Sequence, residues 1–146
     1  MKSVRRPSEL LKRGYSSDEL SDIVALGRHL LKVGELSPAE AIARGLVTVA
    51  PDFIPGWLLL SVVRAMSGDI GEGINAAKQA LQIEPESVEA LLLFVSGLIN
   101  EKDFAAAGAY LGEVGDIIAR QSGKTTIPSE VSRFYKSQLA RYQNRV

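Results

Sequence analysis

The strongest constraint on this chain is a sequence pattern that returns every thirty-four residues. Apolar side chains occupy matching positions in successive periods: Ile23, Trp57 and Leu91 at one phase, and Leu26, Leu60 and Phe94 at another. Turn residues follow the same period. Gly34 and Gly68 are one period apart, and Lys102 occupies the equivalent position in the third period. Pro51 and Pro85 are also one period apart, and Ala119 occupies the position of a third proline. A fixed period of this length indicates a helical repeat array, whose units bury their apolar faces against one another.

Each period carries the signals of two helices joined by a tight turn. In the first period, Ser16 and Glu19 form the pattern of a capping box, and Asp69 is placed to cap a helix in the second. Ser37, followed by Pro38, is expected to cap the second helix of the first period. We therefore expect an all-α fold, a right-handed superhelical solenoid of about three helix pairs in residues 16–121. The pairs would cover residues 16–51, 52–85 and 86–121.

The two ends of the chain differ from the repeats. Residues 1–15 are rich in basic groups and show weak periodicity, so we expect a flexible basic arm. Residues 127–146 have one apolar stripe with basic side chains mostly opposite: Val131, Phe134, Tyr135, Leu139 and Tyr142. A terminal helix with one polar face closes the open end of a stacked array, and we expect this segment to be such a capping helix.

The register resembles that of the tetratricopeptide repeat, a helix-turn-helix unit, over about residues 17–120. The matching positions in the middle unit are Trp57, Leu60, Gly68, Ala80 and Pro85; in the first, Ile23, Leu26, Gly27, Ala39 and Pro51; in the third, Leu91, Phe94, Phe104 and Ala107. The third unit lacks the turn glycine and the closing proline. Arg64 stands where the family usually has an aromatic residue late in the first helix.

The resemblance implies a binding protein with a concave groove lined by the first helix of each unit. By that register the groove would expose ten residues: Val24, Arg28, Leu31, Leu58, Val62, Ala65, Glu89, Leu92, Ser96 and Ile99. Some family members clamp a terminal carboxylate with polar groove residues. Here Val24, Leu59, Glu89 and Leu93 occupy several of those positions, so we expect no such clamp. An apolar groove favours an extended or helical apolar segment as ligand.

Two functions follow from this interpretation. The first is an adaptor or chaperone that holds a partly apolar segment of a partner protein. In size and architecture the chain is similar to the bacterial type III secretion chaperones that hold translocator proteins. The second is a structural module that forms homo-oligomers through its helical faces, with the groove packed by a second copy. The chain's own basic arm could also fill the groove.

Composition and charge narrow the remaining classes. The chain has no Cys and one His, so we expect neither a thiolate metal site nor a His-based one. We also expect no cofactor. No apolar run approaches the ~20 residues needed to span a bilayer, and no secretory signal is evident, so we expect a cytoplasmic protein without membrane insertion. Residues 34–103 carry ten acidic groups against four basic ones, a body that would repel nucleic acid.

Catalysis is not expected. Ser122-Gly123-Lys124-Thr125 has the end of a phosphate-binding loop, but Ile118 stands where the motif needs its first glycine. His29 has no nucleophile nearby in a recognisable motif, and Asp69 and Glu72 lack the alternating oxygen ligands of a calcium loop. The sequence therefore predicts a binding protein and not an enzyme.

Overall fold

The computed structural model describes residues 14–121, 123–124 and 127–145, so the expected arm of residues 1–15 falls almost entirely outside the described part. The described residues form helices and no strand. The helices are α2 (Ser17–Lys32), α3 (Leu36–Val49), α4 (Ile54–Met66), α5 (Ile70–Ile83), α6 (Val88–Asn100), α7 (Phe104–Gln121) and α8 (Ser129–Gln143).

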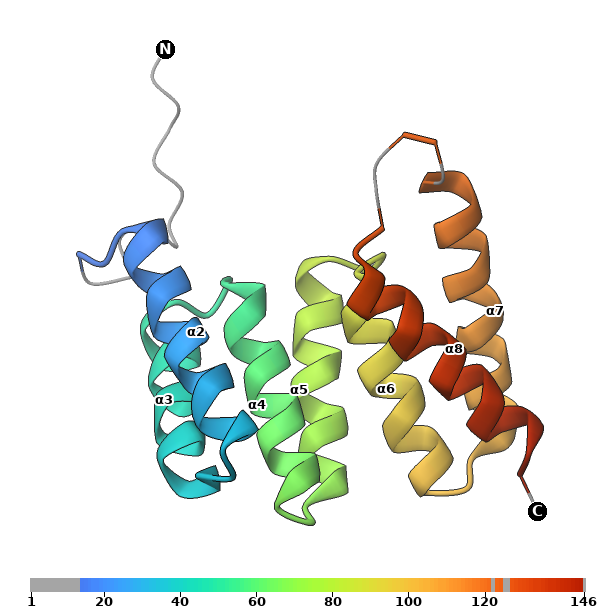
Figure 1. The fold of residues 1–146 in the computed structure, drawn as a ribbon, viewed down its shortest axis with the longest axis horizontal. Helices are drawn as coiled ribbons and strands as arrows, with labels where there is room; N and C mark the ends of the chain where they lie inside the picture. The colour runs from blue at the N-terminus through green and yellow to red at the C-terminus, as the bar shows by residue number, and fades with distance from the viewer. Residues whose placement is uncertain (1–13, 122, 125–126, 146) are drawn as a thin grey trace.

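The helices are arranged as an α-solenoid (Figure 1). Each helix packs against the next along the chain, and α2 also contacts α4, α4 contacts α6, and α6 contacts α8. The first helices of successive pairs therefore lie side by side, as stacked helix-turn-helix units require. This arrangement confirms the expected all-α solenoid. The division into units 16–51, 52–85 and 86–121 stays a prediction.

Local capping explains where several helices begin. The Ser16 hydroxyl accepts a hydrogen bond from the Glu19 amide at 3.0 Å, and the Glu19 carboxylate accepts one from the Ser16 amide at 2.8 Å. Asp69 accepts from the Glu72 amide at 3.3 Å and so caps α5. The expected cap at Ser37 is wrong: α3 begins at Leu36, after Glu35, without a side-chain cap. Ser37 therefore lies inside the first turn of that helix.

The tight turns within the helix pairs use the left-handed backbone conformation. Gly34 has a φ of 86° and Gly68 a φ of 88°. Lys102 takes the same role in the third pair with a φ of 64°, although this conformation is costly for a residue with a Cβ. The thirty-four-residue period thus fixes the backbone of the turn, even where the sequence departs from glycine.

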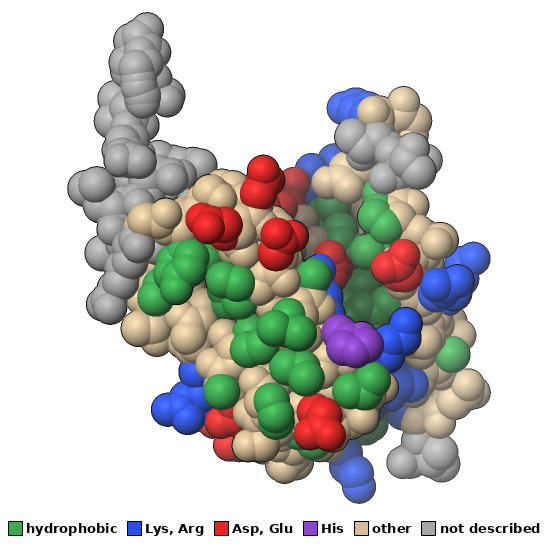
Figure 2. All heavy atoms as spheres, turned by 60° about the vertical axis from the view of Figure 1, so that its left-hand side comes forward, with side chains coloured by type: hydrophobic (Ala, Val, Ile, Leu, Met, Phe, Trp, Pro, Cys, Tyr) green, Lys and Arg blue, Asp and Glu red, His purple; other side chains and the backbone are tan. Residues whose placement is uncertain are grey.

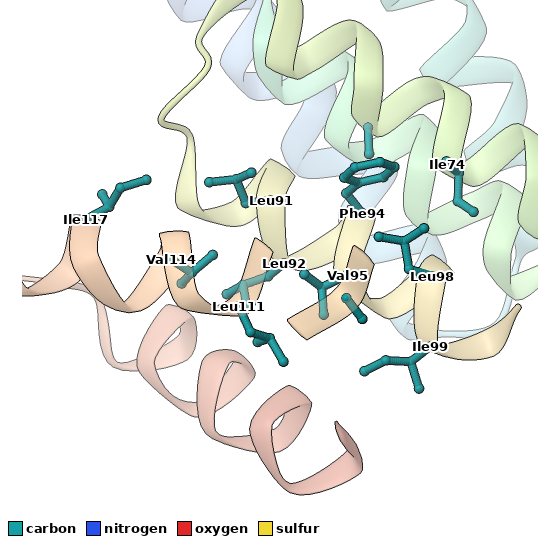
Figure 3. Close-up of a cluster of buried hydrophobic side chains, with 12 residues drawn as sticks. Ile74, Leu91, Leu92, Phe94, Val95, Leu98, Ile99, Leu111, Val114 and Ile117 are labelled. Carbon is teal, nitrogen blue, oxygen red and sulfur yellow. The ribbon is translucent and has the colours of Figure 1, made fainter. Parts of the chain in front are cut away.

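Three clusters of buried side chains run through the array. One joins α2, α3 and α4 around Leu20 and Val63, and another joins α5, α6, α7 and α8. A small third cluster of Leu58, Ala80 and Ala90 lies between them. In the larger C-terminal cluster, side chains of α6 meet those of α7 (Figure 3): Leu91, Leu92 and Val95 against Leu111, Val114 and Ile117. The core therefore extends along the array as neighbour-to-neighbour contacts.

Arg64 links three helices at a position where the periodic apolar pattern is interrupted. From α4 its guanidinium lies 3.7 Å from the Glu40 carboxylate on α3 and 3.6 Å from the Glu72 carboxylate on α5. The Arg64 side chain is 22% exposed, so water screens these ion pairs only in part. Arg64, which interrupts the apolar pattern, thus adds ion pairs that connect α4 to both α3 and α5.

Helix α8 crosses obliquely over α6 and also contacts α7 (Figure 1). Its apolar residues Val131, Phe134, Tyr135, Leu139 and Tyr142 pack against the C-terminal core cluster. Arg141 donates to the Ser96 hydroxyl at 3.0 Å and to the Asn100 side-chain oxygen, both on α6. The stripe expected on the terminal helix is therefore half-buried against the C-terminal cluster, and α8 covers the last part of the concave face.

Candidate binding groove

A hollow of about 260 Å³ lies where the concave sides of α2, α4 and α6 meet. In Figure 2 the face of the molecule is hollowed, with apolar side chains inside, between the near helices and the C-terminal part. The hollow, here called the groove, is lined by Arg28, Leu31, Lys32, Leu58, Leu59, Val62, Glu89 and Leu93. It is the place in the described chain where three first helices share one surface.

The floor of the groove is apolar and belongs to the packed core. Leu58 and Leu59 on α4 are only 7% and 3% exposed. Gly27 lets α2 approach this floor, because a Cβ at Gly27 would lie 2.5 Å from Cδ2 of Leu59. The shape of the groove is therefore set by core packing rather than by loops.

Charged side chains stand on the two walls of the groove. Arg28 and Lys32 lie on α2, one helical turn apart, and Glu89 lies in the first turn of α6. All three are exposed. The ion pairs found among residues 14–121, 123–124 and 127–145 involve none of them. In the described part of the chain the basic wall and the acidic wall are thus exposed to solvent.

The structure brings half of the ten predicted groove residues together. Arg28, Leu31, Leu58, Val62 and Glu89 line the groove. Val24, Leu92 and Ile99 are buried at 3%, 0% and 9% exposure, and Ala65 is exposed but not part of the lining. Ser96 is half-buried under α8. Whether any of these residues contacts a partner stays a prediction.

The expectation that Val24, Leu92 and Ile99 are exposed is wrong, for two physical reasons. Val24 belongs to the core cluster that α2 forms with α3 and α4. Leu92 and Ile99 belong to the C-terminal cluster, which α7 and α8 cover. Leu58 is also buried, but its remaining surface faces the groove. The first helices are packed on more than one side, so few of their apolar residues stay accessible.

Lys32 is the groove residue that sequence reasoning did not name. It follows Arg28 by four residues, and residues four apart share a helix face. The spacing of four residues from Arg28 is the feature of the sequence that predicts Lys32 on the same face of the helix. Leu59 and Leu93, considered above only as positions that a carboxylate clamp would fill, line the groove as apolar residues.

A second apolar surface lies at the open start of the array. A shallow hollow of about 200 Å³ is lined by Tyr15, Ile23, Ala41, Ile42, Gly45, Leu46 and Val49. Leu26, one turn after Ile23, is 52% exposed, and Tyr15 is 44% exposed. Apolar side chains gather on this end of the molecule in Figure 2. This open face is where a preceding helix would pack in a longer array.

In the part of the chain that the structure describes, no three His, Asp or Glu side chains are grouped so that they could hold a metal ion. No described helix is both long and apolar enough to cross a lipid bilayer.

The comparisons with known proteins agree on the fold. No family model matches the sequence. Peroxisome biogenesis protein 5 of Arabidopsis thaliana is 33% identical over 85 residues, a match that covers 58% of this chain and 12% of that protein's length. The Yersinia enterocolitica type III secretion chaperone SycD, in complex with a peptide of the translocator YopD, is similar with a TM-score of 0.71 at 18% identity. That match covers 88% of this chain and 95% of the SycD chain.

A second solved structure is equally similar. The TPR2AB domain of yeast Sti1, in its pHSP90 complex, gives a TM-score of 0.75 at 14% identity, covering 92% of this chain and 50% of that chain. At such identities the likeness establishes the fold, which is that of tetratricopeptide-repeat arrays. The resemblance expected from the thirty-four-residue register is confirmed.

Proposed function

We propose that this tetratricopeptide-like array is an adaptor or chaperone-like protein that holds a segment of a partner polypeptide in its groove. The observation that carries the proposal is the groove itself, a hollow of about 260 Å³ with a leucine floor and charged walls contributed by three helices. Concave sites with an apolar floor and a few polar groups are where proteins bind ligands.

The dimensions favour a polypeptide segment over a small cofactor. The groove is open along the faces of α2, α4 and α6, and its floor offers Leu58, Leu59 and Val62 to an apolar side chain. Binding surfaces of this kind take up the apolar face of a helix or the alternate side chains of an extended peptide. An apolar centre with a polar rim is also the usual composition of a protein–protein contact.

The similar structures support the same reading. SycD is solved with a peptide of YopD, and a Sti1 domain is solved in a pHSP90 complex. Both structures are complexes with a partner, which supports a partner-binding role for this chain. The partner of this chain is a separate question, because the sequence identity to either protein is below 20%.

The proposal is tested by selecting peptides from a random-sequence phage library on the immobilised protein. Selected peptides should lose binding to Leu31→Glu and to Val62→Glu, since each change places a carboxylate in the apolar part of the groove. The matched control is Leu26→Glu on the same helix as Leu31, which is 52% exposed and outside the groove. It should bind the peptides like the wild type.

Circular dichroism and thermal unfolding establish that each variant is folded before binding is measured. Peptides that bind the two groove variants as tightly as the wild type would refute the groove as the binding site. Loss of binding in Leu26→Glu alone would move the site to the open face.

The open face carries the second candidate function, homo-oligomerisation. Leu26 and Tyr15 expose apolar surface beside the shallow hollow at the start of the array, and a second copy docked there would bury it. Sedimentation velocity over a range of concentrations distinguishes the two functions. A dimer that Leu26→Glu dissociates supports self-assembly, whereas a monomer at all concentrations removes it.

A further inference from the structure

The two walls of the groove carry opposite charges. Arg28 and Lys32 extend from α2, and Glu89 extends from α6, with the apolar floor of α4 between the walls. An apolar floor alone would bind any apolar peptide segment, with its chain running in either direction. Charges of opposite sign on the two walls give the groove a polarity, which favours partners whose own charges are complementary.

From this polarity we propose the chemistry of the partner, and the inference rests on the function proposed above. The groove selects a segment in which large apolar side chains lie between an acidic residue and a basic residue. The acidic residue faces Arg28 and Lys32, and the basic residue faces Glu89. The occupant is thus a segment of another polypeptide with an acidic–apolar–basic pattern.

The spacing of that pattern follows from the helix packing. Neighbouring packed helices lie about 8–10 Å apart, so α2 and α6, separated by α4, are about 16–20 Å apart. An extended chain advances about 3.3 Å per residue, so the acidic and basic residues are about five or six residues apart. A cavity of about 150 Å³ accommodates a benzene ring. The groove, at about 260 Å³, therefore has room for one or two large side chains.

Helix α8 limits the segment to this short length. Ser96, further along α6 than Glu89, is engaged by Arg141 of α8, and Ile99 is buried under the same helix. Of α6, Glu89 and Leu93 line the groove, whereas Ile99 lines a separate hollow that it shares with α8. A ligand crosses the array from α2 to α6 and does not continue along α6.

Four acetylated and amidated peptides test the inference by isothermal titration calorimetry: Asp-Ser-Leu-Leu-Ser-Lys, Ser-Ser-Leu-Leu-Ser-Ser, Asp-Ser-Leu-Leu-Ser-Asp and Lys-Ser-Leu-Leu-Ser-Lys. The first should bind about three- to tenfold more tightly than the second at low salt, since exposed ion pairs contribute modestly. High salt should remove most of this difference because it screens exposed charges.

Charge reversal on the protein provides the matched variants. Arg28→Glu with Lys32→Glu makes both walls acidic, so the preference should move to the peptide with two Lys residues. Adding Glu89→Lys should restore the preference for the peptide with one Asp and one Lys, because the walls are again opposite and the peptide can bind in the reversed direction. The three side chains are exposed, so the variants should fold like the wild type.

The outcomes separate this inference from the proposed function. Equal affinity for all four peptides, with binding still lost in Leu31→Glu, overturns the charge selection and leaves the groove function intact. No binding of any of the four peptides, while library-selected peptides still bind the wild type and not Leu31→Glu, also overturns the charge selection and leaves the groove function intact. If the wild type forms a dimer that Arg28→Glu with Lys32→Glu dissociates, the occupant is a second copy of this chain, and the inference is wrong.

Discussion

At the scale of single residues, glycines and their substitutes set how closely the helices pack and where they turn. Gly27 is buried where α2 meets the groove floor, and an added Cβ there would meet Leu59 and Ile42. Gly45, on α3, has open space where its Cβ would be. These two helical glycines therefore have different roles although both are interior helix positions.

Gly27→Ala is predicted to destabilise the protein by about 1–3 kcal/mol, because the added methyl overpacks the contact between α2 and α4. Gly45→Ala is the control and should stabilise it by about 0.5–1 kcal/mol, since alanine favours helix without a clash. Urea unfolding followed by circular dichroism measures both. Equal effects of the two changes would contradict the close approach of α2 to α4.

Lys102→Gly is predicted to stabilise the protein by up to about 1 kcal/mol, because glycine adopts a positive φ without the cost that a Cβ brings. The gain is limited by the larger conformational freedom of glycine in the unfolded chain. Gly68→Ala replaces glycine by a residue with a Cβ at the equivalent turn of the second pair. It should destabilise the protein by about 1 kcal/mol. Thermal unfolding tests the pair, and a loss of stability in Lys102→Gly would argue against the left-handed turn.

At the scale of helices, α8 covers the part of α6 that lies beyond the groove. Its contact with α6 combines apolar packing with a polar set in which Arg141 donates to Ser96, Asn100 and Gln138. Gln138 is itself 5% exposed. The helix is thus held by a mixed interface at the end of the array, where stability is lowest in a stack of neighbour contacts.

Arg141→Ala is predicted to increase hydrogen exchange of the α8 amides about fivefold, because the lost hydrogen bonds contribute about 1 kcal/mol to holding the helix. Amides of α4 should exchange at unchanged rates, since they lie away from this contact. Mass-spectrometric hydrogen exchange resolves the two helices. Unchanged exchange in α8 would show that its apolar stripe alone holds it.

The sequence predicts the elements better than it predicts the groove. The period shared by Trp57 and Leu91, with glycine or Lys102 in the turns, specifies paired helices and their order. It does not distinguish a groove leucine from a core leucine, because first helices pack against partners on several sides. Leu92 was therefore placed in the groove although it is fully buried. The path of α8 depends on contacts such as Arg141 with Ser96, which no periodicity reveals.

At the scale of the whole molecule, the groove is part of the core rather than an addition to it. Leu58 belongs to the small cluster that lies between the N-terminal and C-terminal cores, and it also forms part of the groove floor. Core packing restricts the rotamers of these side chains, which reduces the ordering cost that a ligand must overcome. We therefore expect this surface across α2, α4 and α6 to receive a polypeptide.

Amide chemical-shift mapping by NMR tests that claim most directly, using a peptide selected on the wild-type protein. We expect the largest shifts at Arg28, Leu31, Val62, Glu89 and Leu93, from three helices at once, and small shifts on α3 and α7. Shifts confined to the open face around Ile23 and Ile42, or spread evenly over the molecule, would contradict it.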